Sequence, residues 1–394
     1  MNTYVLDTNV IILDPYVYLS FTGSQVVIPI VVLEELDHFK NEKGFKGKSA
    51  RVFFQEIVKY RSSGSLFEGI FIENVLLKID LMKNIKENQD IVNFNTIDSK
   101  ILSLCLSLPA CILVTNDNNL VLKADALGIP VQSLYEKKDS ENLHHQKIVI
   151  NAEEKKLLLK KSEIPNSENI SYDKYTFLFH EEEIFPVKFD NNKFLLLKEK
   201  EILNIIPKDY SQVAMMEMLL DNTSFLCFLA SSFNKGKTFL TLAAALFQLF
   251  EKKTYEKILF FSPLIGSTKE ILDFDDNVMI DIDDCIHNVL NLLEEILLKY
   301  PEYKKSLNQK FFIKSLGSSF EKSLKNTFFI IDDAQNLTPF EIDSIVKNVA
   351  KGSKIVFIGD TDQIDSAYMT KTSNGYEHAL LKYKNNDFYA SLIL

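Results

Sequence analysis

Short runs of apolar residues alternate with helical stretches through the first 135 residues of the chain. Four of the runs have the composition of β-strands: TYVLD (3–7), SQVVIP (24–29), GIFIEN (69–74) and CILVTN (111–116). Two stretches repeat apolar residues with a helical period: ARVFFQEIVKYR (50–61) and DSKILSLCLSL (98–108). This alternation is typical of a parallel α/β sheet that is covered by helices on both faces.

The rest of the chain divides into a polar stretch, a short β-type segment and a second α/β pattern. EKKDSENLHHQ (136–146) predicts a linker. Three strand candidates follow, KYTFLFH, IFPVKFD and KFLLLKE, and Asp-Asn-Asn at 190–192 predicts a hairpin turn between the last two. Four further runs indicate a second sheet: SFLCFLA (224–230), KILFFS (257–262), NTFFIID (326–332) and KIVFIGD (354–360). We therefore expect three parts: residues 1–135, 136–205 and 206–394.

Acidic residues lie where the apolar runs of the first part end. Asp7 follows the first run and Asp117 the last, while Glu35 and Asp98 lie in VVIPIVVLEEL and NTIDSKIL between them. Parallel sheets place their chemistry at the carboxyl ends of their strands. Carboxylates that meet there repel one another unless cations lie between them, and carboxylate oxygens suit Mg²⁺ or Mn²⁺. Taken singly, Asp98 is also a candidate helix cap and Asp117 a candidate turn residue, but their shared order and placement favour a metal site.

Several motifs of the first part resemble those of a PIN domain, the fold of metal-dependent ribonucleases. LDTNV, IPIVVLEELD, DSKIL and LVTND occur in the family's order. IPIVVLEELDHFK, SAR at 49–51 and ADALGIP at 124–130 are closer to the PIN module that is fused to PhoH-type ATPases. The resemblance implies a ribonuclease whose metal ligands and catalytic residues are Asp7, Glu35, Asp98 and Asp117. Glu34 is the competing choice for the second ligand, and Asn9 is expected beside the four acids.

Charge limits how the chain can bind RNA. Its 394 residues carry a net charge of −10, which gives no general attraction for nucleic acid, so binding requires a local basic patch. The best candidate patch contains Lys40, Lys43, Lys46, Lys48 and Arg51. Phe45 lies among them and could stack against the bases of single-stranded RNA. A solvated charged loop is the alternative. Val121 stands where the fused family keeps an arginine.

The last part contains a strand, a loop and a helix in the order of a phosphate-binding loop. SFLCFLASSFNKGKTFLTLAAAL places Gly236, Lys237 and Thr238 where backbone amides, a lysine and a Mg²⁺-binding hydroxyl are needed. Ser231 and Asn234 occupy positions of glycines. Asn tolerates positive φ, so Ser231 is the larger change.

Two later strands end in acids, as the partners of such a loop do. NTFFIIDDAQNLTP ends a strand at Asp332 and Asp333, and KIVFIGDTDQID ends another at Asp360, with Gln363 beyond it. This half resembles the PhoH family of P-loop ATPases from about Ile205 to the end. The resemblance implies an ATP site in which Asp333 is catalytic and Thr238 and Asp332 hold Mg²⁺. The remaining contacts to the nucleotide are expected from Gly236, Lys237, Gln212 and Gln363.

Arginine is nearly absent from the chain. Only Arg51 and Arg61 occur, and Ser262, Lys322 and Asn348 stand where the family has arginines. Asp333 is also one methylene shorter than the family's Glu. Because phosphoryl transfer depends on an arginine that stabilises the transferred group, we expect ATP to bind but to be hydrolysed slowly.

Composition excludes several other classes of protein. No apolar run reaches the length of a membrane span, and Asp7 interrupts any signal-peptide core, so a cytoplasmic protein without a membrane partner is expected. The four cysteines form no CxxC or Cys/His pairing, which argues against zinc and disulfides.

We therefore expect a PIN–PhoH-like fusion: an α/β nuclease domain, a small β-rich connector and a RecA-like P-loop NTPase domain. Its expected function is metal-dependent RNA cleavage coupled to an ATP-binding domain. The alternatives are an ATP-driven RNA helicase-nuclease and a nucleotide-responsive scaffold that binds RNA without cutting it. The family resemblance also implies a homo-oligomer, with the hexameric ring as the family form.

Overall fold

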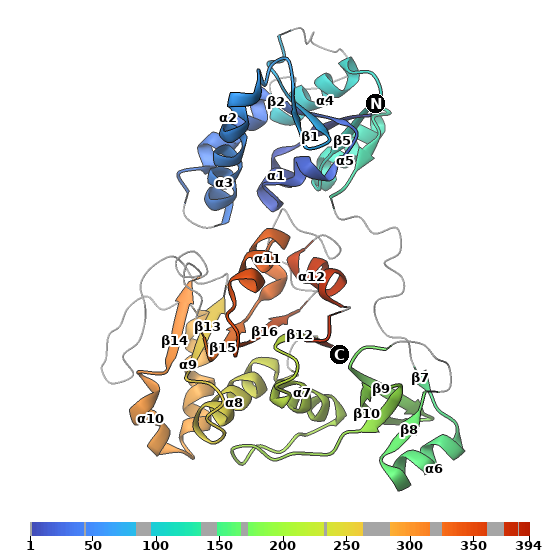
Figure 1. Cartoon of the computed structure of the whole chain (residues 1–394), viewed down its shortest axis with the longest axis vertical. Coiled ribbons are helices and arrows are strands. Elements are labelled where there is room, and N and C mark those ends of the chain that lie inside the picture. The colour runs from blue at the N-terminus through green and yellow to red at the C-terminus, as the bar shows by residue number, and fades with distance from the viewer. Residues whose placement is uncertain are drawn as a thin grey trace. The chain divides into compact units, whose positions relative to one another are not determined.

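The computed structural model describes most of the chain, which forms two compact units (Figure 1). The N-terminal unit is built mainly from residues 1–138, and the C-terminal unit from most of the remainder. The described residues are 2–42, 45–83, 96–134, 148–166, 172–231, 235–262, 284–315, 325–360, 374–384 and 386–394. The expected linker at 136–146 lies outside them.

The N-terminal unit contains a six-stranded sheet with the order β3-β4-β2-β1-β5-β6. Its strands are β1 (Thr3–Leu6), β2 (Gln25–Pro29), β3 (Ile70–Ile72), β4 (Val75–Asp80), β5 (Cys111–Val114) and β6 (Val131–Gln132). Its helices are α1 (Thr8–Leu13), α2 (Ile30–Phe39), α3 (Phe45–Tyr60), α4 (Ile97–Ser107) and α5 (Asn118–Ala126), with short 3₁₀ turns at Val17–Ser20 and Arg61–Ser63. The two central strands, β2 and β1, are mostly buried along their length, as expected for strands that helices cover on both faces.

One edge of this sheet differs from the prediction. The run at 69–74 was expected to be a parallel strand, but β3 pairs antiparallel with β4 through a tight turn at Glu73, whose φ is 53°. The strand β4 was not predicted from the sequence. Its residues VLLKID follow the previous run after only two residues, Glu73 and Asn74, so the two strands read as one stretch.

The C-terminal unit begins with a five-stranded sheet of order β7-β9-β10-β11-β8. Its elements are β7 (Ile148–Val149), α6 (Ala152–Lys161), β8 (Glu163–Pro165), β9 (Tyr175–His180), β10 (Glu183–Asp190) and β11 (Lys193–Leu196). The predicted hairpin is confirmed: Asn191 and Asn192 adopt φ values of 48° and 60° between antiparallel β10 and β11. Helix α6 was not predicted. It starts with a capping box formed by Asn151 and Glu154.

A six-stranded parallel sheet completes the C-terminal unit, in the order β14-β13-β15-β16-β12-β17. The strands are β12 (Leu226–Ala230), β13 (Lys257–Ser262), β14 (Phe311–Ser315), β15 (Thr327–Ile331), β16 (Lys354–Gly359) and β17 (Tyr389–Ile393). The helices are α7 (Tyr210–Leu220), α8 (Lys237–Phe250), α9 (Asp284–Leu297), α10 (Pro301–Leu307), α11 (Pro339–Asn348) and α12 (Gly375–Tyr383), with a 3₁₀ turn at Ala334–Asn336. Separate apolar cores form where α7 and α8 cover one face and α11 and α12 the other (Figure 1). The predicted parallel α/β sheet is therefore confirmed.

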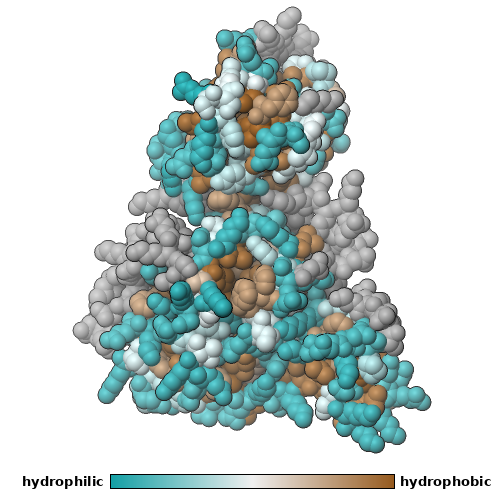
Figure 2. Space-filling model, viewed as in Figure 1, coloured by the Kyte–Doolittle hydropathy of each residue, from teal (hydrophilic) through white to brown (hydrophobic). Residues whose placement is uncertain are grey.

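Hydrophilic residues cover most of the visible face of each unit, and hydrophobic residues are exposed only in small patches (Figure 2). Among the described residues, no helix is both long and apolar enough to cross a membrane.

Candidate functional sites

Asp7 lies at the carboxyl end of the central strand β1 and caps helix α1. Only 7% of the residue is exposed. Its Oδ1 accepts a hydrogen bond from the Thr8 amide at 2.7 Å. Its Oδ2 accepts from Asn9 Nδ2 at 2.6 Å and from Thr115 Oγ1 at 2.7 Å. The carboxylate is therefore fixed by donors from two adjacent strand ends, β1 and β5.

The charge around Asp7 is unfavourable in the absence of a cation. The pKa of Asp7 is raised to about 7, chiefly by burial and also by the nearby carboxylates of Asp98 and Glu35, although the hydrogen bonds from Thr115 and Thr8 oppose the shift. The structure thus brings three of the four predicted acids within electrostatic reach of one another.

The structure separates the two candidate glutamates of helix α2. Glu35 Oε2 accepts a hydrogen bond from Thr8 Oγ1 at 2.6 Å, next to Asp7. Glu34 instead lines a shallow hollow of about 320 Å³ with Asp37, His38 and Phe54. Its position therefore favours Glu35 as the acid that belongs with Asp7.

The other two acids lie at the starts of helices. Asp98 is in the first turn of α4, whose cap is Thr96, and its Oδ2 is 2.9 Å from Lys123 Nζ. Asp117 caps α5 by accepting from the amides of Asn119 at 2.8 Å and Leu120 at 3.4 Å. Asp98 thus has a lysine as its partner, and Asp117 has backbone amides of its own helix.

The four acids have the donor chemistry for a divalent ion but are not yet gathered around one point. Within the described ranges, no three His, Cys, Asp or Glu side chains lie close enough together to hold a metal ion as they stand. The donor chemistry nevertheless fits Mg²⁺ or Mn²⁺, because the acids are carboxylates and those of Asp98 and Glu35 act electrostatically on buried Asp7.

The second site surrounds the start of helix α8. Gly236 adopts the left-handed conformation with φ 78°, directly before Lys237. Lys237 Nζ donates to the carbonyl oxygen of Ser231 at 2.5 Å and to its Oγ at 3.0 Å. Asn234 lies outside the described residues. The sequence therefore places a glycine where the backbone requires one, and a lysine beside the end of β12.

A hydroxyl and two strand-end acids lie close to this lysine. Thr238 Oγ1 donates to Asp332 Oδ2 at 2.8 Å. The pKa of Asp332 is raised to about 7, chiefly by burial and also by the charge of Asp333. Burial also lowers the pKa of Lys237, while the charges of Asp360, Asp332 and Asp333 oppose that shift. The predicted lysine, threonine and acids are thus brought together.

Asp333 and the strand end beside it are held by side chains that were not predicted. Asp333 is in the left-handed conformation with φ 53°, and its Oδ2 accepts from Ser262 Oγ at 3.2 Å. Gln335 Oε1 accepts from the Asp360 amide at 3.1 Å, which ties β15 to β16. Gln363 lies outside the described residues.

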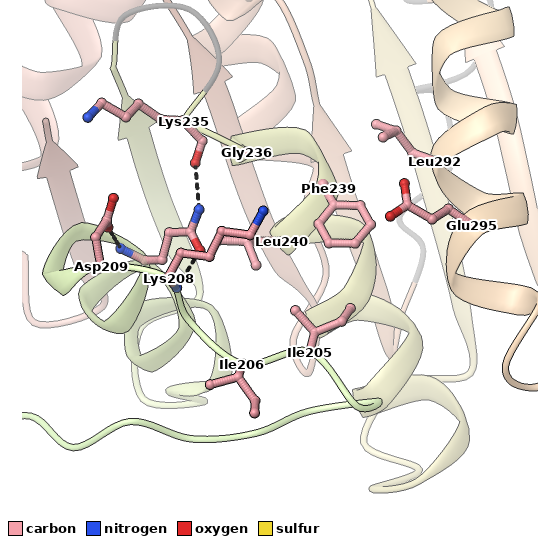
Figure 3. Close-up of a pocket in the computed structure, with 11 residues that line it drawn as sticks. Ile205, Ile206, Lys208, Asp209, Lys235, Gly236, Phe239, Leu240, Leu292 and Glu295 are labelled. Atoms are coloured by element: carbon pink, nitrogen blue, oxygen red, sulfur yellow. Dashed lines mark hydrogen bonds between the residues drawn. The ribbon is translucent and has the colours of Figure 1, made fainter.

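A hollow of about 520 Å³ lies between the starts of α7 and α8 (Figure 3). Gln212 accepts from the Lys208 amide at 2.9 Å and donates to the Lys235 carbonyl at 3.4 Å, so it connects both sides. The apolar part of the lining is Ile205, Ile206, Phe239, Leu240 and Leu292. An apolar surface with an amide at its edge suits a flat heteroaromatic base.

Comparison with known proteins assigns both units. Residues 4–135 match the PIN domain family, and residues 204–393 match the family described as PhoH-like protein. The chain is a PIN–PhoH fusion. A protein named PhoH2 from Bacillus subtilis is 28% identical and covers 99% of this chain and 96% of its own length. A PhoH2 from Thermobispora bispora is 22% identical and covers 100% of this chain and 92% of its own length.

The PIN–PhoH fusion therefore joins a nuclease-type domain to a P-loop ATPase-like domain. These families support RNA cleavage and nucleotide binding as its two general activities. They also account for the carboxylate edge in one unit and the lysine–threonine–aspartate cluster in the other.

Three residues of the PIN domain site were missed from the sequence: Thr8, Thr115 and Lys123. Both threonines stand within two residues of an acid, in LDTNV and LVTND, so their proximity was visible. Their partners were not, because the bonds of Thr115 to Asp7 and of Thr8 to Glu35 cross between different elements. Lys123 meets Asp98 only because α4 and α5 lie near each other.

The predicted basic patch is largely engaged in local contacts. Arg51 Nη1 donates to the Lys40 carbonyl at 2.6 Å and the Glu42 carbonyl at 3.3 Å, at the end of α2. Lys40 pairs with Asp37, and Lys46 lies over the ring of Phe39 at 5.3 Å. Lys43 and the side chain of Phe45 lie outside the described residues. Arg51 therefore has a structural role at this helix end.

Proposed function

We propose that this PIN–PhoH fusion is a metal-dependent ribonuclease whose second domain binds ATP and hydrolyses it slowly. The observation that supports cleavage most directly is the environment of Asp7. This carboxylate is buried, held by donors from two strand ends, and carries a pKa raised to about 7 beside Glu35 and Asp98. Such a site gains most from a bound cation.

In this proposal Asp7, Glu35, Asp98 and Asp117 hold Mg²⁺ or Mn²⁺. A divalent cation there lowers the pKa of a bound water and stabilises charge on the leaving oxygen of an RNA phosphodiester. Asn9 and Thr115 orient Asp7, and Thr8 orients Glu35, so that the carboxylates need little rearrangement when the ion binds.

Paired substitutions test this assignment. We expect Asp7→Asn and Glu35→Gln each to reduce cleavage of a labelled single-stranded RNA in Mn²⁺ by at least about 100-fold, because each removes a ligand. Glu34→Gln is the matched control, since Glu34 lines a different hollow, and it should leave cleavage within about twofold. The assignment of Glu35 is wrong if Glu34→Gln is the inactive member of the pair.

The same experiment distinguishes the nuclease from an RNA-binding scaffold. A scaffold would bind the labelled RNA without any metal-dependent cleavage. Intact Asp7→Asn protein that still cleaves at the wild-type rate would contradict the nuclease site itself, and circular dichroism would establish that the variant is folded.

In the PhoH-like domain, Lys237, Thr238 and Asp332 are proposed to bind ATP–Mg²⁺, with the base in the hollow beside Gln212 and Asp333 beside the γ-phosphate. The cluster around Lys237 supports binding. The absence of any arginine after Arg61 supports slow turnover, because such a residue is worth about 10³–10⁵ in rate.

We expect full-length protein to bind ATP–Mg²⁺ with turnover below about 0.1 per second, with or without RNA. Lys237→Ala should abolish binding, as measured by fluorescence of a labelled nucleotide, because it removes the cation that contacts the phosphates. Fast turnover that RNA stimulates and that Lys237→Ala removes would instead favour the ATP-driven helicase-nuclease. A homo-oligomer is proposed from the family resemblance, and light scattering of the full chain tests it.

A further inference from the structure

Lys123 brings a positive charge to the proposed nuclease site. It lies in the last turn of α5, the helix that Asp117 caps, and its Nζ is 2.9 Å from Oδ2 of Asp98. Asp98 in turn lies in the first turn of α4. Both charges stand where helix dipoles favour them, since an acid stabilises a helix start and a base a helix end.

The acid that Lys123 neutralises belongs to the charge cluster of Asp7. The negative charge of Asp98 adds to the effect of burial in raising the pKa of Asp7, as does that of Glu35. The ammonium group of Lys123 therefore offsets part of the negative charge that a divalent cation would otherwise offset.

The contact between Lys123 and Asp98 is easily exchanged. The two side chains are 42% and 32% exposed, so water screens their attraction. Ion pairs of this kind contribute little to stability. A divalent cation that several carboxylates share binds more strongly than a monovalent ammonium on a flexible stem.

We propose that Lys123 is the resident counter-ion of Asp98 in the metal-free PIN domain. A divalent cation displaces it, and the freed ammonium then binds a phosphate of the RNA. This inference rests on the proposed function, since it takes Asp98 to be a metal ligand. It gives the PIN domain an RNA contact that appears only when the metal site is filled.

Mn²⁺ binding to the full-length protein without nucleotide tests the first half of the proposal. Calorimetry would compare wild type, Lys123→Met and Lys123→Arg, with Asp7→Asn identifying heat that comes from the PIN site. We expect Lys123→Met to tighten Mn²⁺ binding roughly two- to fivefold, the range of an exposed ion pair, and Lys123→Arg to change it less. Lys59→Met is the matched control, because Lys59 pairs with Glu56 on α3, and it should leave Mn²⁺ affinity unchanged.

The sign of the change separates this role from a structural one. If Lys123 merely joined α4 to α5, its loss would loosen Asp98 and weaken Mn²⁺ binding. Unchanged or weaker binding in Lys123→Met therefore overturns the inference and leaves the proposed ribonuclease intact. Wild-type protein without any Asp7-dependent Mn²⁺ binding overturns both together.

Anisotropy of a labelled 2′-O-methyl RNA, which resists cleavage, tests the second half. In Mn²⁺ we expect Lys123→Met to weaken RNA binding about two- to fivefold, and in a chelator to leave it unchanged, because Asp98 then retains the ammonium. Equal weakening under both conditions would contradict the exchange.

Discussion

At the scale of single residues, Ser231 replaces a glycine at the start of the expected phosphate-binding motif. Ser231 stands where the family has glycine, yet it is not among the described non-glycine residues with positive φ. The side chain therefore causes no backbone strain at this position. Its effect is chemical, because Oγ of Ser231 accepts a hydrogen bond from Lys237, the side chain that we propose binds the phosphates.

This contact makes a prediction about ATP affinity. Ser231→Gly should tighten ATP–Mg²⁺ binding about fivefold, because Lys237 no longer gives up a hydrogen bond of about 1 kcal/mol when it turns to the phosphates. Ser231→Ala removes the same hydroxyl and keeps the side-chain carbon, so it should have the same effect in a nucleotide titration. A gain with glycine alone would show that backbone freedom, not the hydroxyl, limits the loop.

At the scale of elements, helix α7 joins the β-rich segment to the P-loop sheet. Asp221 ends α7 and accepts from Tyr175 Oη at 2.7 Å and Lys188 Nζ at 3.0 Å, both from the β9–β10 pair. Buried Lys354 of β16 donates to the carbonyls of Met218 and Asp221 at 2.8 and 2.9 Å. One end of α7 is thus fixed by two sheets, while its start carries Gln212 beside the hollow that lies between α7 and α8.

We expect Asp221→Asn to destabilise the C-terminal unit by roughly 2–4 kcal/mol at pH 7, since it leaves Lys188 and Lys174 without their buried partner. Burial alone would raise the pKa of Asp221, but bonds from Thr223, Tyr175 and Lys188 hold it well below its ordinary value.

The pH dependence of this loss follows from that lowered pKa. A lowered carboxyl pKa contributes stability above pH 4 that is lost as the pH falls, so the difference from wild type should shrink toward pH 3. Urea unfolding at several pH values measures it. Asp190→Asn, at the exposed end of β10, is the control and should change the free energy of unfolding by less than about 0.5 kcal/mol. An equal loss in both variants would contradict the role of Asp221.

At the scale of the whole molecule, each compact unit contains one buried carboxyl with a raised pKa. Asp7 in the N-terminal unit and Asp332 in the C-terminal unit both have a pKa near 7, chiefly because of burial. Each lies at the carboxyl end of a parallel strand, and each has another carboxylate nearby. In both units, a bound divalent cation would lower the free-energy cost of ionising the buried carboxyl.

In a chelator, we expect both units to lose stability as the pH rises from about 4 to about 7, by up to about 4 kcal/mol for each group. A raised carboxyl pKa means that the folded state holds a proton which the unfolded state releases. Asp7→Asn should flatten this dependence for one unit and Asp332→Asn for the other, in thermal unfolding from pH 5 to pH 8. Excess Mg²⁺ should reduce the slope of the wild type. An identical slope in wild type and both variants would contradict this origin.

The sequence by itself determined the local elements and the chemistry of the sites. Continuous apolar runs predicted the central strands, and Asp-Asn-Asn at 190–192 predicted the β10–β11 hairpin. The order of Gly236, Lys237 and Thr238 predicted the start of α8. These features depend on a few neighbouring residues and on backbone conformations that few residue types adopt. The acids at strand ends were visible for the same reason.

Only the tertiary structure decided which side chains meet. Glu34 and Glu35 are adjacent in sequence, but the direction of α2 places only Glu35 against Thr8 and Asp7. Lys123 and Asp98 are 25 positions apart and touch because the last turn of α5 lies near the first turn of α4. Because β3 is the edge strand of its sheet, it pairs with β4 alone and can run antiparallel to it. Such contacts depend on the direction and spacing of whole elements, which no local pattern specifies.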